Sequence, residues 1–161
     1  IDRRALIDMD QDLAPYRLLI ANGLPAVMVA HVLYPDIDSV PASASTRWIR
    51  GLLRTEMRFQ GVVFADDLSM AGAASVGGIV ERAERALAAG CDVLPVCNHR
   101  PSVELLLDGF KAPADPASAL RRVRLRGKPS PDPQALRASS LWQAAQQALA
   151  RTEAPPDLRL A

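Results

Sequence analysis

Two adjacent carboxylates, Asp66 and Asp67, come directly after the apolar run Gly-Val-Val-Phe-Ala. Such a run predicts a buried strand, and a carboxylate at its end is partly desolvated yet reachable by a ligand. This position suits a nucleophile, a metal ligand or a general base, and position by itself does not choose among the three. The structural alternative is an aspartate that caps a helix at Leu68-Ser69-Met70, a role that suits Asp67.

Polar side chains also end two further apolar runs. The first run carries His31, and the last leads into Asn98-His99-Arg100. In α/β sheets and barrels the working groups gather at the carboxyl ends of the strands, so three strands here would deliver side chains to one rim. A plain loop boundary has the same polar appearance, and this alternative stays open.

The elements that must position these groups are three short apolar runs separated by helical patterns. The runs are Ala26–Leu33, Gly61–Ala65 and Asp92–Cys97. Continuous apolar runs are typical of parallel strands covered on both faces, and their starts lie about 30–35 residues apart, the length of a βαβ unit. The sequence therefore predicts an α/β fold. Because Pro95 lacks an N–H, its strand is expected to lie at an edge or to be bulged, or else the predicted strand is displaced by one residue.

Helical periodicity predicts three helices around these strands. One runs through Leu13–Ala21, with Pro15 in its first turn, and ends at Asn22-Gly23. Ser45 is expected to cap the second, whose apolar residues are Trp48, Ile49, Leu52, Leu53 and Met57. Gly90 is placed to end the third, whose apolar stripe is Val80, Ala83, Ala86 and Leu87.

The composition changes after Phe110, where prolines punctuate polar stretches. Gln134–Arg151 predicts a further helix, with one apolar face formed by Leu141, Trp142, Ala145 and Leu149. The last residues, Glu153–Ala161, are expected to form a frayed tail.

Charge and composition exclude several partners. The net charge of +1, from 19 basic and 18 acidic residues, gives no electrostatic reason to expect nucleic acid or an anionic membrane. No run approaches the ~18 apolar residues of a membrane span and no secretory leader opens the chain, so a cytoplasmic protein is expected. The chain also contains a basic run, Arg121, Arg122, Arg124 and Arg126. No aromatic residue that could stack on a base interleaves with it, so we interpret this run as a solvated face.

The cysteines and glycines exclude further chemistry. If Cys91 and Cys97 flank a strand they lie roughly 20 Å apart, too far for a disulfide, and unpaired thiols fit a reducing compartment. No metal-ligand spacing accompanies them. The glycines do not space as a dinucleotide-binding fingerprint, no P-loop is present, and Ser69 lacks the glycines of a nucleophile elbow.

Three blocks of the sequence, in their order and spacing, resemble the bacterial β-N-acetylhexosaminidases of glycoside hydrolase family 3 that act on cell-wall muropeptides. The blocks are AVMVAHVLYPDIDSVPASAS, RWIRGLLRTEMRFQGVVFADDLSMAGA and ALAAGCDVLPVCNHR, and the similarity covers roughly Asp12 to Phe110. That family folds as a (β/α)₈ TIM-type barrel. The resemblance therefore implies that residues 1–110 form its C-terminal part, with the last three βα units. Residues 111–161 would then be a proline-rich linker and a C-terminal helix that packs on the barrel.

The resemblance also implies roles for site residues. The family's phenylalanine–serine–Asp–Asp–leucine–serine–Met motif has the nucleophile as its first aspartate, which matches Asp66, with Ala65 here in place of the serine. His31 would lie one strand away on the same rim, either in the pocket wall as a hydrogen-bonding residue or in contact with the ligand. Asp67 and Met70 are further pocket candidates, and Met70 is expected to pack in the core near the pocket.

The implied reaction is retaining hydrolysis of terminal β-linked N-acetylglucosamine from muropeptides through a covalent glycosyl-enzyme, with no metal or organic cofactor. The family's lysine–histidine–phenylalanine–proline–glycine motif, its histidine-bearing acid/base loop and its sugar-binding arginines precede the matched region and are not found in this chain. A missing general acid typically costs ~10²–10⁴-fold in rate, so we expect this chain alone to be inactive or nearly so. A partial barrel also exposes sheet edges, so we expect marginal stability, self-association or pairing with the absent half.

Two other functions stay open at this point. An acidic pair after an apolar strand also occurs in phosphoacceptor or Mg²⁺-binding receiver modules, although here the pair lies on a middle strand and no lysine ends a later one. The other is a non-catalytic remnant that folds, or binds a sugar, without turnover.

Overall fold

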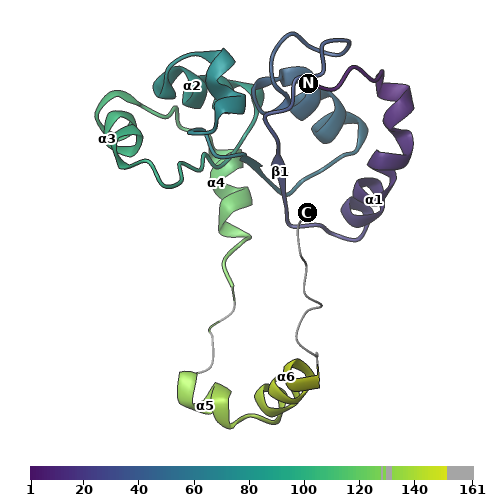
Figure 1. Cartoon of the computed structure of the whole chain (residues 1–161), viewed down its shortest axis with the longest axis vertical. Coiled ribbons are helices and arrows are strands. Elements are labelled where there is room, and N and C mark those ends of the chain that lie inside the picture. Colours follow the sequence, from purple (N-terminus) through teal and green to yellow (C-terminus); the bar gives the residue numbers. More distant parts are fainter. Residues whose placement is uncertain (128, 130–131, 152–161) are drawn as a thin grey trace, which may run out of the picture. The chain divides into compact units, whose positions relative to one another are not determined.

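The structure is a computed structural model that describes residues 1–127, 129 and 132–151 (Figure 1). The chain divides into two compact units, Ile1–Arg126 and Gly127–Ala161. The tail expected over Glu153–Ala161 lies outside the described residues.

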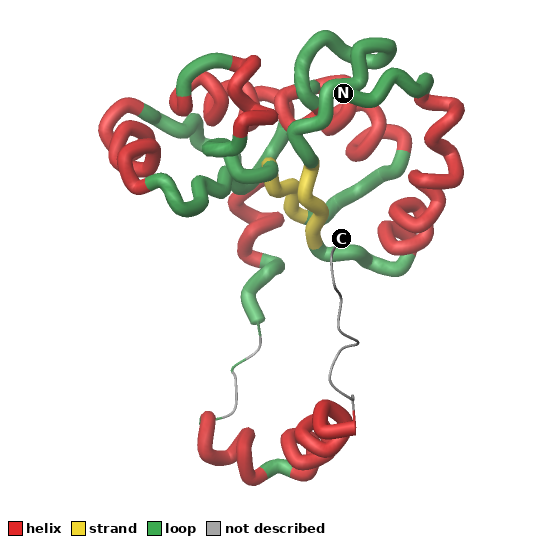
Figure 2. The backbone as a smooth tube through the Cα atoms, in the orientation of Figure 1, coloured by secondary structure: helices red, strands yellow, loops and turns green. Residues whose placement is uncertain are grey.

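The centre of the first unit is a short parallel sheet (Figure 2). Strands β1 (Ala26–Val29) and β2 (Val62–Ala65) pair in register from Ala26↔Val62 to Val29↔Ala65. The third expected strand is reduced to one parallel bridge, Phe64↔Val93. The α/β class is confirmed. The predicted bounds are wrong, because β1 and β2 are shorter than predicted and the third segment does not form a strand.

Pro95 explains the loss of the third strand. A proline has no N–H to donate, so the ladder with β2 cannot continue past it. Its carbonyl instead accepts the backbone N–H of Leu68, at 3.0 Å, and thereby holds the loop that follows β2. The expected edge or bulged strand at Pro95 is therefore not formed, and in the described residues the segment keeps only its bridge to β2.

The first helix begins earlier than its apolar pattern predicts. A 3₁₀ turn, η1 (Leu6–Met9), leads into α1 (Asp10–Ala21), so Pro15 lies inside the helix and its placement in the first turn is wrong. The predicted end is confirmed, because the Asn22 side chain donates to the Leu18 carbonyl at 2.8 Å and Gly23 has a φ of 84°.

The second helix has an unexpected hydrogen-bond pattern. η3 (Arg47–Glu56) is a π-helix, with i→i+5 bonds, where the apolar spacing predicts an α-helix. Ser45 does cap it, because the Ser45 hydroxyl accepts the backbone N–H of Trp48 at 3.2 Å. The third helix is confirmed as α2 (Ile79–Ala89), ended by Gly90 at a φ of 116°.

Further helices complete the first unit: η2 (Ala42–Ala44), η4 (Ala71–Val76), α3 (Arg100–Gly109) and α4 (Pro116–Val123). Because α4 belongs to this unit, the compact region extends beyond Phe110, where the composition changes. In the second unit a single helix was expected over Gln134–Arg151. The structure has two helices there, α5 (Pro133–Ala138) and α6 (Ser140–Arg151). Packing of the C-terminal helix on the first unit stays a prediction.

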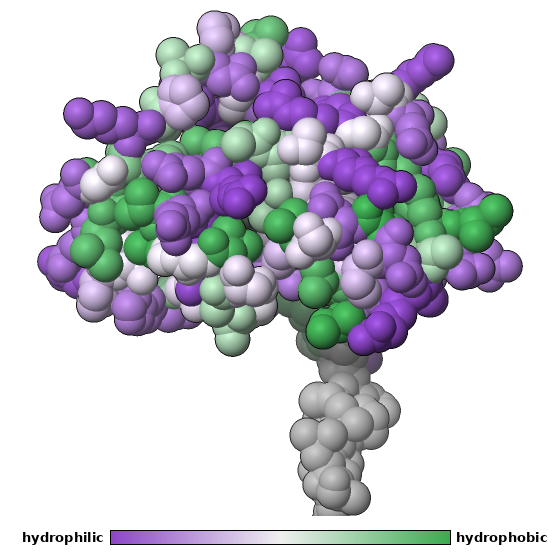
Figure 3. All heavy atoms as spheres, turned by 90° about the horizontal axis from the view of Figure 1, so that it is seen from above, coloured by the Kyte–Doolittle hydropathy of each residue, from purple (hydrophilic) through white to green (hydrophobic). Residues whose placement is uncertain are grey.

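The hydrophobic core lies on one face of the sheet. Helices η3 and α2 contribute to a cluster with Val63 and Ala65 of β2, against which Val27 and Val29 of β1 pack. Alternation along the strand turns Met28 to the opposite face, where it is 59% exposed. We call this opposite face, which carries Met28 and Phe64, the open face. In the view of Figure 3, hydrophobic side chains are exposed in several patches among hydrophilic ones.

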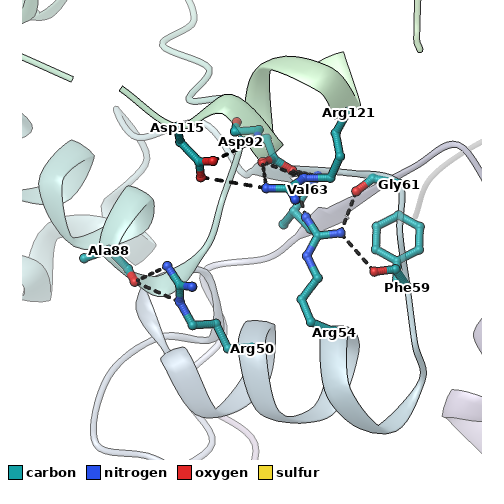
Figure 4. Close-up of polar contacts among 10 residues, drawn as sticks. Arg50, Arg54, Phe59, Gly61, Val63, Ala88, Asp92, Asp115 and Arg121 are labelled. Atoms are coloured by element: carbon teal, nitrogen blue, oxygen red, sulfur yellow. Dashed lines mark hydrogen bonds and ion pairs between the residues drawn. The ribbon is translucent and has the colours of Figure 1, made fainter. Parts of the chain in front are cut away.

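A buried charge cluster lies at the amino-terminal side of the strands (Figure 4). The Asp92 carboxylate is 1% exposed, pairs with Arg54 at 2.8 Å and Arg121 at 2.7 Å, and accepts the Val63 N–H at 2.9 Å. Burial raises the pKa of Asp92, but the hydrogen bonds from Arg121 and Val63 outweigh it and hold the pKa below its ordinary value. A solvated face is therefore wrong for Arg121, although the other three arginines of that run are exposed.

Candidate active site

Strand β2 carries Asp66 to its carboxyl end. The Asp66 N–H donates to the Val29 carbonyl at 3.0 Å, so the ladder with β1 continues through this residue. Since Val63 and Ala65 lie in the core, alternation places half-buried Asp66 on the open face. Its carboxylate accepts the Asp67 N–H at 2.8 Å, and within the part of the chain that the structure describes this is its one hydrogen bond. The remaining lone pairs are available to a ligand.

Asp67 is occupied by contacts from its own loop and from the third segment. Its Oδ1 accepts the backbone N–H of Ser69 at 2.9 Å and that of Cys97 at 3.0 Å, and the Ser69 hydroxyl lies 2.7 Å away. Burial raises the pKa of Asp67, but these hydrogen bonds outweigh it and lower the pKa. Residues 68–70 form a turn rather than the helix that Asp67 was expected to cap. Asp67 therefore stays ionised and organises the loop.

His31, which follows β1, connects η2 to this loop. Its Nε2 lies 2.9 Å from the Asp67 carbonyl oxygen, and its Nδ1 lies 2.6 Å from the Ser43 hydroxyl. Both ring nitrogens are therefore engaged by the protein. This is the hydrogen-bonding alternative weighed for His31.

Arg82 of α2 contacts the same loop from the other side, and sequence reasoning missed it. Its guanidinium donates to the Leu68 carbonyl at 2.8 Å and to the Gly77 carbonyl at 2.7 Å. The sequence does contain a signal for a buried contact of Arg82, because this residue directly precedes Ala83, a member of the helix's apolar stripe. A charged side chain at the edge of a buried stripe needs polar partners.

Met70 is placed differently from expectation. The residue is 46% exposed, so the core position predicted for it is wrong. Its backbone N–H donates to the Asp67 carbonyl at 3.0 Å and closes the turn. A role for the Met70 side chain in a substrate pocket stays a prediction.

The third segment contributes backbone more than side chains to this rim. The Cys97 N–H reaches Asp67, but the side chains of His99 and Arg100 contact residues of α3. His99 Nδ1 accepts the N–H of Ser102 at 3.3 Å as the cap of that helix, and Arg100 pairs with Glu104 at 2.8 Å. The rim therefore brings Asp66, Asp67 and His31 together without His99 and Arg100.

The described residues offer neither a metal site nor a membrane span. Among residues 1–127, 129 and 132–151, no group of three or more His, Cys, Asp or Glu residues is arranged to hold a metal ion. In the same ranges no helix has the length and apolar character needed to cross a membrane. Cys91 is a buried free thiol and Cys97 an exposed one.

Comparison with known proteins identifies the family. The glycosyl hydrolase family 3 N-terminal domain matches residues 5–123. The chain is 46% identical over 134 residues to a beta-hexosaminidase of Nitrosospira multiformis, covering 82% of this chain and 38% of that protein. It is 39% identical over 160 residues to the beta-hexosaminidase of Thioalkalivibrio sulfidiphilus, covering 99% of this chain and 46% of that protein.

A solved structure agrees with these relatives. NagZ from Neisseria gonorrhoeae, in complex with N-trifluoroacetyl-D-glucosamine, superposes with a TM-score of 0.79 at 40% identity, covering 92% of this chain and 43% of that one. The chain thus spans less than half the length of the relatives that it matches. On the domain match and these identities, the chain belongs to the glycosyl hydrolase family 3 N-terminal domain family.

Proposed function

We propose that this chain supplies the nucleophile of a retaining β-N-acetylhexosaminidase, and that Asp66 is that nucleophile. The observation that carries the proposal is the environment of Asp66 at the carboxyl end of β2. Its carboxylate is half-buried, lies on the open face and accepts a hydrogen bond from Asp67 N–H. Asp66 would attack the anomeric carbon, and water would later release the sugar from the covalent intermediate.

The general acid must come from groups other than the neighbours of Asp66. Asp67 is held ionised by the hydrogen bonds from Ser69 and Cys97, so it has no proton to give at neutral pH. His31 has both nitrogens engaged, by Ser43 and by the Asp67 carbonyl. The isolated chain should therefore hydrolyse an aryl N-acetylglucosaminide at a negligible rate. Turnover by the isolated chain that disappears in Asp66→Asn would contradict this expectation.

The substrate and architecture are part of the same proposal. We take the three βα units as the last three of a (β/α)₈ barrel and the substrate as terminal N-acetylglucosamine of muropeptides, released in peptidoglycan recycling. The N-trifluoroacetyl-D-glucosamine complex of the Neisseria gonorrhoeae protein supports an amino-sugar ligand. A cytoplasmic location, expected from the unpaired thiols, stays a prediction.

The test uses a full-length chimera, in which residues 1–161 replace the matching segment of the Thioalkalivibrio sulfidiphilus beta-hexosaminidase. A fluorinated N-acetylglucosaminyl substrate that forms the glycosyl-enzyme faster than water releases it should leave its adduct on Asp66, as located by peptide mass spectrometry. Asp66→Asn should abolish both turnover and adduct, whereas Asp36→Asn, at an exposed aspartate, should change neither. An adduct on Asp67, or turnover that survives Asp66→Asn, would contradict the assignment.

The phosphoacceptor or Mg²⁺-binding alternative finds no support at this site. Such a site needs two carboxylates that are free to bind a cation. The Asp67 carboxylate is instead occupied by Ser69 and Cys97. A chimera that binds the sugar but does not turn it over would favour the non-catalytic remnant.

A further inference from the structure

The loop after Asp66 is held at two successive carbonyl groups by side chains from different elements. The Asp67 carbonyl accepts from His31 Nε2 at 2.9 Å, and the Leu68 carbonyl accepts from the Arg82 guanidinium at 2.8 Å. His31 follows β1, whereas Arg82 belongs to α2. Neither contact is needed to form the turn itself, which is closed by the Asp67 carboxylate and by the Met70 N–H.

The His31 contacts require a proton on one particular nitrogen of the imidazole ring. A carbonyl oxygen only accepts hydrogen bonds, so Nε2 must carry a proton. The Ser43 hydroxyl, 2.6 Å away and on a residue only 2% exposed, can then donate to an unprotonated Nδ1. The pair of contacts therefore requires a proton on Nε2, whereas Nδ1 can either accept from or donate to the Ser43 hydroxyl. Gly72 lets the following helix pack closely on His31, since a Cβ there would lie 3.0 Å from the His31 Cβ and 3.3 Å from its carbonyl oxygen.

The Arg82 contacts bracket the helix that follows the loop. One guanidinium nitrogen donates to Leu68, before η4, and another donates to Gly77, directly after it. The planar fork of arginine can satisfy both carbonyls from one fixed position, which a lysine ammonium matches less well. Arg82 is half-buried, so water competes only in part for these bonds.

From these contacts we infer that His31 and Arg82 are positioning residues, a clamp that sets the direction of the Asp66 carboxylate. The link to Asp66 is Asp67, which donates its N–H to Asp66 Oδ1 at 2.8 Å while its carbonyl is held by His31. If the loop shifted, the Asp67 N–H would move away from Asp66, and the Asp66 carboxylate would no longer be oriented toward the anomeric carbon. The inference rests on the proposed role of Asp66 as the nucleophile.

The first test measures turnover in the full-length chimera described above. His31→Asn and Arg82→Met should lower kcat on the order of 10–100-fold with little change in KM, since a misplacement of about 1 Å costs up to 10²-fold. In His31→Gln the side-chain amide nitrogen can occupy the place of Nε2, so it should recover most of kcat, whereas the shorter Asn reaches only the place of Nδ1. The matched control is Arg85→Met, on the same helix but exposed, which should retain wild-type kcat.

The second test needs neither activity nor a variant. In the unaltered 161-residue chain, ¹⁵N NMR of the imidazole nitrogens should report a proton on Nε2 of His31. An Nε2 without a proton, as in the Nδ1–H tautomer, would overturn the clamp even if the variants fail to fold. Wild-type kcat in His31→Asn and Arg82→Met, combined with loss of turnover in Asp66→Asn, would also overturn it and leave the nucleophile in place. Turnover that survives Asp66→Asn would remove the proposed function first.

Discussion

At the scale of single residues, Asp66 and Asp67 show how neighbours of one chemical type are given different roles. Alternation along β2 leaves the Asp66 carboxylate with one hydrogen bond in the described residues, whereas Asp67 receives N–H groups from Ser69 and Cys97. The sequence predicts that this pair ends a strand, but it does not divide the roles. The division depends on Cys97, which is thirty positions away and comes close only after the sheet has formed.

The two thiols differ in burial, and this difference predicts their reactivity. Cys91 is 4% exposed, and burial raises its pKa to about 12, with the charge of Asp92 adding to the effect, whereas Cys97 is exposed. Because the thiolate is the reactive form, iodoacetamide at about pH 8 should alkylate Cys97 in the native chain and leave Cys91 unmodified. Peptide mass spectrometry over a time course measures both, and in denaturant their rates should converge. Equal rates in the native chain would contradict the burial of Cys91.

At the scale of elements, Asp92 joins its own segment to three others that are distant in the sequence. Arg54 comes from η3, Arg121 from α4 and the Val63 N–H from β2. The cluster lies at the amino-terminal ends of the strands, where barrel enzymes place residues for stability, and Asp66 lies at the other end. The sequence hinted at such a partner, because an aspartate within an apolar strand segment needs a counter-charge.

Replacing Asp92 should therefore destabilise the fold in a pH-dependent way. Asp92→Asn leaves two partly buried arginines without their carboxylate, which should lower the free energy of unfolding by roughly 3 kcal/mol at neutral pH. The pKa of Asp92 is lowered in the folded chain, so its stabilisation is complete above the unfolded value, about 3.9, and is lost as the pH falls through the folded value. Urea titrations at several pH values should show the variant and wild type converging at acid pH.

The matched control for this experiment is Asp108→Asn, at an exposed aspartate of α3. It should leave the free energy of unfolding within about 0.5 kcal/mol of the wild type, as is usual for surface substitutions. An equal effect of the two substitutions at neutral pH would show that the Asp92 cluster has no special stabilising role.

Two glycines provide a second prediction at this scale. A Cβ at Gly61 would lie 2.4 Å from the Pro25 carbonyl oxygen and 2.5 Å from the Phe59 ring, whereas at Gly51 it would meet nothing within 4 Å. Gly61→Ala must displace Pro25, whose carbonyl begins the ladder with Val62, and should cost at least about 1–3 kcal/mol.

Gly51→Ala should instead stabilise η3 by roughly 0.5–1 kcal/mol, because alanine loses less backbone entropy in a helix than glycine. Thermal melts followed by circular dichroism should shift in opposite directions for the two variants. A downward shift in both would mean that helix η3 is more crowded around Gly51 than the structure indicates.

The sequence predicts elements well where their signals are local. The ends of α1 and α2 are marked by Gly23 and Gly90, and both were predicted. Signals that depend on distant partners were weaker. The loss of the third strand follows from Pro95, yet only the finished sheet supplies Leu68 as the donor to its carbonyl. The break between α5 and α6 comes from the extended backbone of Ser139, whose hydroxyl then caps α6 by accepting the Trp142 N–H at 3.2 Å.

At the scale of the whole molecule, the open face of the sheet is covered only in part, since Val62 on that face is buried and Met28 is not. Parallel sheets are normally buried on both faces, but Met28 on the open face is 59% exposed. Within the described residues β1 is paired along one edge, with β2, so its other edge presents unpaired backbone groups. A cavity of about 280 Å³ lies beside β1, and Met28, Tyr34 and Trp48 are among the residues that line it. Apolar surface and a free edge therefore coincide at β1.

The isolated chain should consequently self-associate through β1. Sedimentation velocity at increasing concentration should show dimers or larger species, and Met28→Lys should shift the population to monomer, because a lysine on an edge strand must be desolvated when a second strand pairs with it. Met70→Lys is the matched control, since Met70 is also exposed, at 46%, but follows β2 in a loop. A single monomeric species with a cooperative melt at every concentration would contradict this prediction. It would mean that the open face and the β1 edge are stable in water without a partner.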